Sequence, residues 1–511
     1  MLLAAVSLVG CAGGDQAGEV DDLDADKADG VSYPLGTFDT TSPKLYEVSE
    51  LTLNADKSFG RQTEVACAGG GGCGPEKESG TYKFTKSGSI RYIRFLDEKG
   101  ALIDRYQWTL SGKTLKIRNT DSKAPGTEWI TLMQVAARVV AQMNDVSILL
   151  PLATTQADFN AYLPASAEGV GGPLVPKDIF TAFDVPAMTA VGPGAPELVY
   201  STLRLVAARL DPCFAQIGPI TDPTSCQNQL RVIFQSLSFG SGTTTAEDSG
   251  LHVFYSLTRD QFTAALRQVI ALREANGGEA DLGPLAVHPI IAKQGVAGAM
   301  GKALAAIIEQ YAGTGTITRM TRIYSSNDFW DFNGIDIANG APLPMVIPTL
   351  PNNSTTVEFV SPLGGNTLGG TFVPGTTSSD NMDLLALFAD AEKATTHARQ
   401  SAFDAVLRIE NPNFNSPNTI DCASCHVSAV ARMLNGAALG LSATGDPNAF
   451  VAPASIPSAD LAATAPPIPG ADSRDFHMFS YKGTQPLIMQ RVINETASVV
   501  AYVNAQVLTS E

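Results

Sequence analysis

Two cysteines and a histidine near the C-terminus form the pattern in this sequence with the clearest chemical meaning. They lie in the stretch TIDCASCHVSA, residues 419–429, as Cys422, Cys425 and His426. Cysteines three positions apart on one helical turn point the same way, so both thiols can reach a single group, and the next residue can place an imidazole beside it. The pattern indicates either attachment of one group to both cysteines or a disulfide between them.

Residues 422–426, CASCH, resemble the haem-attachment motif of c-type cytochromes. The resemblance implies one covalent haem c, with Cys422 and Cys425 forming thioethers and His426 acting as the proximal iron ligand. A Cys422–Cys425 disulfide is the main alternative. A thioredoxin-like CxxC would need a βαβ setting, which the flanking Pro- and Asn-rich loop does not supply. A structural zinc site would need a second ligand pair at close spacing, which the sequence lacks.

The same resemblance implies a distal ligand in a loop before the last helix. Met478 fits this position, and His477 beside it is the alternative. Met433 is excluded, because it lies on the helix that carries His426 and cannot cross to the opposite haem face. Met489 is expected in the core, and structural or surface roles are expected for the other histidines, His252, His288 and His397. An open position would instead permit peroxide or small-ligand chemistry.

The N-terminal segment MLLAAVSLVGCAGG resembles a bacterial lipoprotein signal peptide, residues 1–11, with a lipobox ending at Cys11. The resemblance implies lipidation of the Cys11 thiol, and Ala12 favours the outer membrane, on its periplasmic or cell-surface face. Residues 12–32 are acidic and without apolar periodicity, which predicts a flexible tether. Export implies an oxidising compartment, so two further disulfides are expected, Cys67–Cys73 and Cys213–Cys226.

Composition restricts the classes of partner. The chain has 511 residues, of which 44% are hydrophobic and 17% are charged, as in a globular protein with several domains. The formal net charge of −17 argues against nucleic acid or anionic lipid as the main partner. The sequence has no later run of about 18 apolar residues, so it predicts no transmembrane helix. We therefore expect contact with a membrane only through the lipid anchor.

The predicted fold class is multi-domain α+β. Short alternating runs in residues 33–133, such as YQWTL and TLKIR, predict a small antiparallel β barrel or sandwich that resembles lipocalin-like barrels in outline. Residues 134–378 predict an α+β domain of unknown role, with paired strands flanking the Cys213–Cys226 segment and a capping box at Thr258. Residues 379–511 predict a mostly helical cytochrome c-like haem region, closed by a helix entered at Pro486.

Taken together, these patterns predict a lipid-anchored, exported c-type cytochrome that transfers electrons to or from a redox partner protein. An electron carrier is favoured over an enzyme. One alternative is a peroxidase-like haem oxidoreductase, although the familiar c-type peroxidases carry two CxxCH motifs and this chain has one. The other is a non-haem, disulfide-stabilised lipoprotein that binds a ligand. No Ser/His/Asp set, phosphate-binding loop or carboxylate pair can be identified from the sequence.

Overall fold

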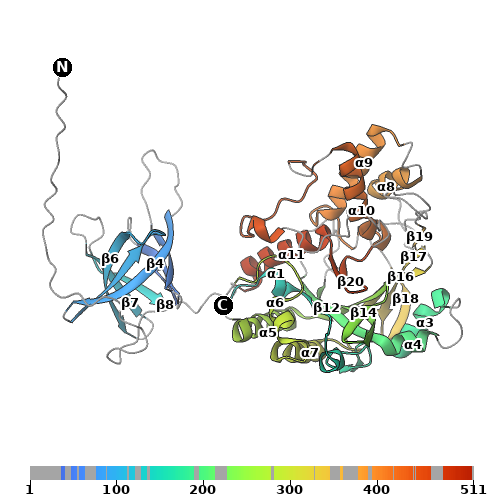
Figure 1. The fold of residues 1–511 in the computed structure, drawn as a ribbon, viewed down its shortest axis with the longest axis horizontal. Helices are drawn as coiled ribbons and strands as arrows, with labels where there is room; N and C mark the ends of the chain where they lie inside the picture. The colour runs from blue at the N-terminus through green and yellow to red at the C-terminus, as the bar shows by residue number, and fades with distance from the viewer. Residues whose placement is uncertain are drawn as a thin grey trace, which may run out of the picture. The chain divides into compact units, whose positions relative to one another are not determined.

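The computed structural model of the chain contains two compact units, residues 1–138 and 139–511, and each is described by itself (Figure 1). The structure describes residues 36–40, 48–54, 57–63, 76–87, 89–111, 114–120, 128–134, 139–188, 195–212, 227–277, 281–326, 329–345, 357–360, 378–389, 394–417, 419–440, 442, 445–461 and 476–508.

The first unit is a closed antiparallel barrel whose strands follow one another in sequence order. Its strands are β1 (Gly36–Asp39), β2 (Val48–Leu53), β3 (Ser58–Thr63), β4 (Glu76–Ser87), β5 (Ile90–Leu96), β6 (Leu102–Ser111), β7 (Thr114–Asn119) and β8 (Ile130–Gln134). The barrel closes where β1 pairs with β8. Leu115 and Ile117 of β7 are buried inside it, whereas Lys116 between them is exposed. Period-2 alternation therefore builds this core.

The second unit is built on one antiparallel sheet. Its strands are β9 (Ser147–Leu149), β12 (Leu203–Asp211), β13 (Asn228–Gly240), β14 (Thr243–Ala246), β15 (Ser249–Leu257), β16 (Ile317–Ser326), β17 (Phe329–Ala338), β18 (Ala341–Pro344) and β19 (Val357–Val360). The main path runs β18-β17-β16-β15-β13-β12-β9, while β14 pairs with β13 and β19 pairs with β17. The pairing of β12 with β13 confirms the expected strand pair on either side of residues 213–226.

One face of this sheet is covered by α1 (Met143–Val146), α5 (Arg259–Gly277) and α7 (Ala299–Tyr311). Helix α5 begins with the expected capping box, in which Thr258 N donates to Gln261 Oε1 and Gln261 N donates to Thr258 Oγ1. Its Val269 meets Leu230 of β13 around a small apolar cavity, so this face is the main core. Shorter elements complete the unit: α2 (Gln156–Asn160), β10 (Glu168–Gly169), β11 (Gly172–Pro173), α3 (Lys177–Met188), α4 (Ala195–Thr202) and α6 (Pro289–Gln294).

The other face carries the C-terminal elements. These are α8 (Ser379–Ala389), α9 (Thr396–Glu410), α10 (Cys422–Leu439), β20 (Phe479–Lys482), β21 (Gln485–Ile488) and α11 (Gln490–Tyr502). In Figure 1, α9 and α10 lie across the sheet from α5 and α7. A buried apolar cluster joins β17 to these helices through Trp330, Phe332, Val406, Ala423 and Val427.

The predicted fold class is therefore wrong. Residues 379–511 do not form a mostly helical, cytochrome c-like region of their own, because α9 and α10 bury their apolar faces against β17 of the large sheet. The described chain is mostly antiparallel β structure with helices laid on the sheet. Pro486 is also not the start of the last helix: it belongs to β21, and α11 begins at Gln490. Helical periodicity shows that one face is covered, without showing what covers it.

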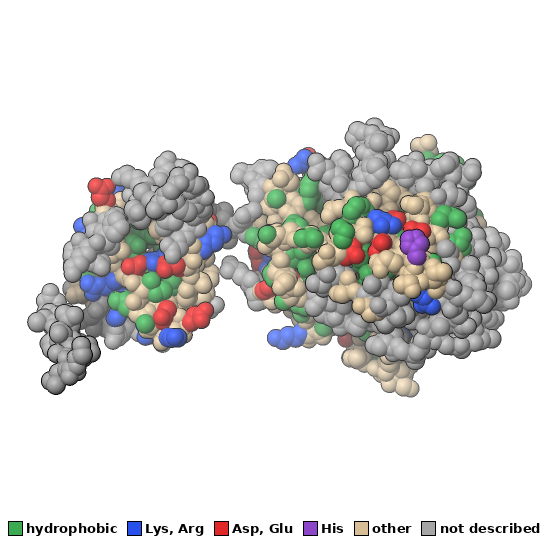
Figure 2. Space-filling model, turned by 90° about the horizontal axis from the view of Figure 1, so that it is seen from above, with side chains coloured by type: hydrophobic (Ala, Val, Ile, Leu, Met, Phe, Trp, Pro, Cys, Tyr) green, Lys and Arg blue, Asp and Glu red, His purple; other side chains and the backbone are tan. Residues whose placement is uncertain are grey.

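The surface and the helix lengths give two further observations. In the part of the chain that is described, no helix is both long enough and apolar enough to span a membrane. On the face drawn in Figure 2, Lys and Arg side chains are scattered among acidic and apolar ones. A buried charged cluster lies between the sheet and α11, where Arg209, Arg231 and Glu495 are largely buried.

Candidate functional site

The cysteine–histidine motif forms the first turns of α10, and buried hydrogen bonds fix that end of the helix. Asp421 precedes the helix and is fully buried; its Oδ1 accepts from Ser424 N at 2.9 Å, as an N-cap does. Its Oδ2 accepts from Ser424 Oγ at 2.8 Å and from Asn381 Nδ2 of α8 at 2.6 Å. Because the turn is capped in this way, Cys422 and Cys425 project from the same face of α10.

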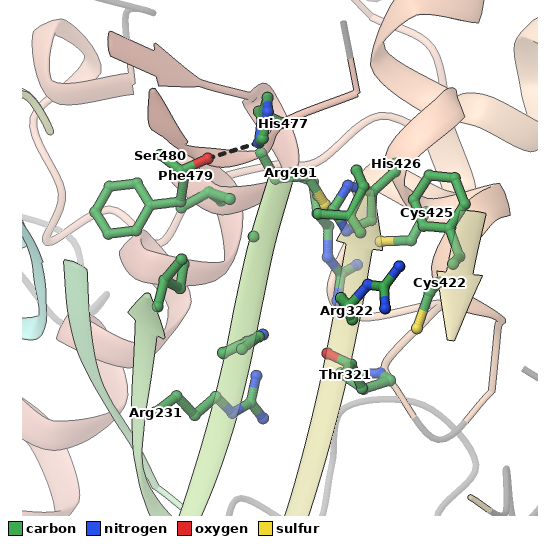
Figure 3. Close-up of a pocket in the computed structure, with 18 of the residues that line it drawn as sticks. Arg231, Thr321, Arg322, Cys422, Cys425, His426, His477, Phe479, Ser480 and Arg491 are labelled. Carbon is green, nitrogen blue, oxygen red and sulfur yellow. Dashed lines mark hydrogen bonds between the residues drawn. The ribbon is translucent and has the colours of Figure 1, made fainter. Parts of the chain in front are cut away.

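Both cysteines and His426 face one large cavity. It lies between the free face of the sheet and the elements α10, α11 and residues 476–480, and holds about 1240 Å³ of empty space including its mouth. Figure 3 shows Cys422, Cys425 and His426 on one side, with the strands that carry Arg231 and Thr321 across from them. The cavity therefore brings both thiols and the imidazole to one shared space, which is open at its mouth.

The two thiols do not have the properties of a reactive dithiol. Cys422 and Cys425 are free and are not joined by a disulfide. Burial, reinforced by the Asp421 charge, raises the pKa of Cys422 to about 12 and that of Cys425 to about 11. Redox-active thiols and thiolate metal ligands need a lowered pKa. The motif therefore presents two neutral thiols to the cavity.

His426 is held so that one ring nitrogen stays available. Its Nδ1–H donates to the carbonyl oxygen of Phe476, and that assignment of the proton follows because a carbonyl can only accept. Burial lowers the pKa of His426 to about 4, so the imidazole is neutral and Nε2 carries a lone pair. Metal-ligating histidines commonly have this arrangement, with the other nitrogen bonded to a backbone carbonyl.

The sheet side of the cavity is basic. Arg209 pairs with Arg231 across β12 and β13, and Phe254 of β15 pairs with both Arg231 and Arg319. Directly paired residues share one face of a sheet, so the three guanidinium groups form a row. Each has an acidic neighbour: Glu495 lies 3.2 Å from Arg209, Asp211 lies 2.6 Å from Arg231 and Asp336 lies 2.6 Å from Arg319.

Arg209 is incompletely paired. It is 8% exposed, and within the described ranges no acceptor bonds to its Nε or Nη2. Only its Nη1 approaches a carboxylate, that of Glu495. A buried cationic group with free N–H donors is costly unless a counter-ion or acceptor reaches it. Arg209 therefore adds an incompletely neutralised positive charge to the sheet side of the cavity.

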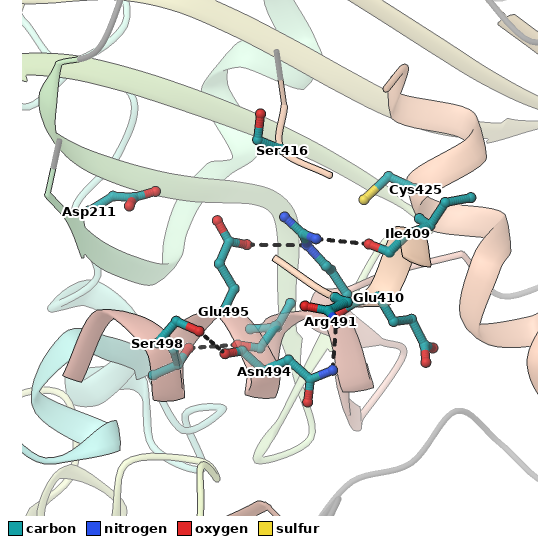
Figure 4. A network of polar contacts seen from close by, with 12 residues as sticks. Asp211, Ile409, Glu410, Ser416, Cys425, Arg491, Asn494, Glu495 and Ser498 are labelled. Carbon is teal, nitrogen blue, oxygen red and sulfur yellow. Dashed lines mark hydrogen bonds and ion pairs between the residues drawn. The ribbon is translucent and has the colours of Figure 1, made fainter. Parts of the chain in front are cut away.

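Helix α11 connects this basic row to α9 (Figure 4). Arg491 Nη1 donates to the carbonyl of Ile409 in α9 at 2.8 Å, and its Nε lies 3.6 Å from Glu495 Oε2. Burial alone would raise the pKa of Glu495, but the surrounding Arg209, Arg491 and Arg231 lower it to about 2. Glu495 is therefore ionised, and it orders the arginines from the side opposite the sheet.

The structure places the two expected distal ligands differently. Met478 is half-buried and lines the cavity. His477 also lines it, but both of its ring nitrogens are engaged: Nε2 with Asp248 Oδ1 and Nδ1 with Ser480 Oγ, each at 2.9 Å. It has no nitrogen left for a metal. Met489 is fully buried and precedes α11, as expected of a core residue.

Several functional features were not identified from the sequence. The Ser480–His477–Asp248 chain is one, because Asp248 is 229 residues from His477; Ser480 is buried in β20, so the chain fixes residues 476–480 beside the cavity. The basic row is another, and His252 on the cavity wall is a third. The alternating strand patterns would show which of these residues share a face, but not that α10 lies over that face.

Some predicted residues lie outside the described residues. These are Cys11, Cys67, Cys73, Cys213 and Cys226, together with the side chain of Met433. The expected lipidation and the two expected disulfides therefore stay predictions.

Comparison with protein-family models, with curated proteins and with solved structures finds no match to this chain. Among the residues that the structure describes, no three His, Cys, Asp or Glu side chains gather as a metal site. A haem iron takes four of its ligands from the porphyrin, so it needs only one or two side chains from the protein. The cavity lining includes one such side chain, the oriented imidazole of His426.

Proposed function

We propose that this protein is an exported c-type cytochrome that binds one covalent haem and transfers electrons. The observation that carries the proposal is the coincidence of the CxxCH turn with the cavity: both thiols and His426 line the same space, opposite the arginines of the sheet. The Phe476 carbonyl supports it by holding Nδ1 of His426 and leaving Nε2 free.

In this proposal, residues of the second unit hold the group in three ways. Cys422 and Cys425 bond it covalently, and His426 ligates the iron through Nε2. Arg209 and Arg231, whose side chains line the cavity, hold the propionate carboxylates from the sheet. When bound, the haem accepts and releases one electron at iron. The protein sets how readily this happens through the axial ligands and burial.

The setting of the protein follows from the same proposal. Its donor and acceptor are other exported redox proteins, which exchange single electrons with the iron. Cys11 carries a lipid that holds the chain on the outer membrane, on the periplasmic or the cell-surface face. The tether of residues 12–32 then separates the anchor from the barrel.

A haem stain on the denatured chain tests the proposal. The protein is expressed in a host with c-type haem maturation, and each variant is compared with the wild type by haem stain and pyridine haemochrome spectrum. We expect the wild type to stain and the Cys422→Ala/Cys425→Ala variant to lose the stain. Cys422→Ala alone and Cys425→Ala alone should each give the haemochrome spectrum of a haem with a single thioether. The matched control is Cys67→Ala/Cys73→Ala, which removes another close cysteine pair. An unstained wild type, beside a stained control cytochrome, contradicts the proposal.

A further inference from the structure

His252 lies on the cavity wall opposite the motif helix. It is the fourth residue of β15, where it pairs with Ile233 of β13 and with Thr321 of β16. All three line the cavity, which shows that this row of the sheet faces it. The His252 side chain is half-buried and lines the cavity.

His252 has a ring nitrogen free to bind a ligand. Its ring lies against Phe254, with 4.3 Å between centroids, and no described residue hydrogen-bonds to either nitrogen. Burial, together with the charges of Arg231 and Arg209, lowers the pKa of His252, so the imidazole is neutral. His477 differs in this respect, since both its nitrogens are bonded.

The registry of the sheet places an open slot between His252 and His426. The His426 ring lies 5.2 Å from the ring of Phe332. Phe332 pairs with Ile323, which pairs with Gly250, two residues before His252 on the same face. With strands about 4.8 Å apart and a rise of about 3.4 Å per residue, Phe332 and His252 are about 12 Å apart at Cα. Gly250 adds no side chain to the space between, and the Ile323 side chain lies beside it.

Met478 lies on the other side of that slot. The Phe476 carbonyl accepts from Nδ1 of His426, so this segment lies behind the imidazole, away from Nε2. Met478 is only two residues further along, and its carbonyl accepts from Met489 N at 2.9 Å. The main chain of Met478 is therefore held on the His426 side, whereas His252 comes from the sheet.

We propose that His252 is the second axial ligand, so that the haem iron is held between His426 and His252. This inference rests on the proposed function, because it assumes the haem attached at Cys422 and Cys425. Iron with two histidine ligands has no open position for peroxide, and its reduction potential is lower than with methionine, which raises it. The protein is then a low-potential electron carrier and not a peroxidase.

Spectra of the haem-loaded, full-length chain test the assignment. We expect a low-spin ferric wild type without the sulfur-to-iron charge-transfer band of methionine ligation, and an electron paramagnetic resonance spectrum of two histidine ligands. His252→Ala should convert the ferric iron to high spin, and added imidazole should restore low spin. Met478→Ala, and the control His397→Ala at an exposed position of α9, should leave the spectra unchanged.

Two results would overturn the assignment: a low-spin His252→Ala variant with the wild-type spectrum, or a change to high spin in Met478→Ala. If His252→Ala fails to fold, the electron paramagnetic resonance spectrum of the wild type alone distinguishes the two ligands, because methionine ligation gives a different signal. The haem stain separates this failure from that of the proposed function. A stained chain with another ligand rejects only His252, whereas an unstained wild-type chain rejects both.

Discussion

We expect both motif thiols to react slowly in the folded, haem-free chain, which can be made in a host without haem maturation. The raised pKa values, about 12 for Cys422 and about 11 for Cys425, determine the thiolate fraction. At pH 8 these values leave about one thiol in ten thousand ionised at Cys422 and about one in a thousand at Cys425. An ordinary thiol, with a pKa of about 8.5, is roughly one-quarter ionised at that pH.

Two opposing effects give the expected rate. The smaller thiolate fraction slows reaction roughly 2000-fold at Cys422 and roughly 200-fold at Cys425. A thiolate of higher pKa is a stronger nucleophile, and a Brønsted coefficient of about 0.4–0.5 recovers roughly 40-fold and roughly 10-fold. We therefore expect net slowing of about 50-fold at Cys422 and about 20-fold at Cys425 relative to the unfolded chain.

A small neutral disulfide reagent, followed by mass spectrometry of the peptide that spans residues 422–426, measures both rates. The same chain in urea is the reference, and circular dichroism checks that the chain without urea is folded. Cys425 should be modified first. Equal rates in the folded and unfolded chains would refute the burial argument. A peptide that reacts in neither state until reductant is added would instead show a Cys422–Cys425 disulfide.

Two further predictions concern the groups that support the site. Asp421→Ala removes the cap of α10 and leaves the buried Asn381 amide without its carboxylate, so the free energy of unfolding of the second unit should fall by about 2–4 kcal/mol. Denaturant titration would measure this loss, and Asp446→Ala, at a half-exposed position, is the control that should cost no more than about 1 kcal/mol. An equal loss in both variants would contradict the buried network. Because the folded pKa of Glu495 lies near 2, below its ordinary value of 4.5, its ion pairs stabilise the fold above about pH 4.5 and are lost as the pH falls towards 2. Glu495→Gln should therefore remove part of the acid-induced loss of stability, whereas the control Glu309→Gln on α7 should not. If the stability of Glu495→Gln falls with acid as steeply as that of the wild type, the result would count against the role of the arginines.

Local patterns in the sequence predicted local structure well. The alternating runs gave β12, β13 and the strands of the barrel, and the Thr258 box gave the start of α5. The motif turn also forms the start of a helix, as its spacing required. These features depend on neighbours a few residues apart, so the information they need is present in each segment.

Long-range contacts were not predictable in the same way. The apolar faces of α9 and α10 could have met each other or a sheet, and only the fold shows that β17 covers them. From the sequence, His252 is an ordinary strand residue, because the strand LHVFYSL contains no information about which residues face its side chain. Pro486 is compatible with a helix start, but pairing with Tyr481 placed it in a hairpin. In each case the deciding partner is distant in sequence or is set by tertiary packing.

The central claim is covalent haem at Cys422 and Cys425. The mass of the peptide that contains both cysteines tests this claim most directly. The protein comes from a host with haem maturation and is digested under conditions that preserve thioethers. We predict that the peptide spanning residues 422–426 carries the mass of one haem and that neither of its cysteines can be alkylated after reduction. The same peptide without added mass, with both cysteines alkylated after reduction, would contradict the account.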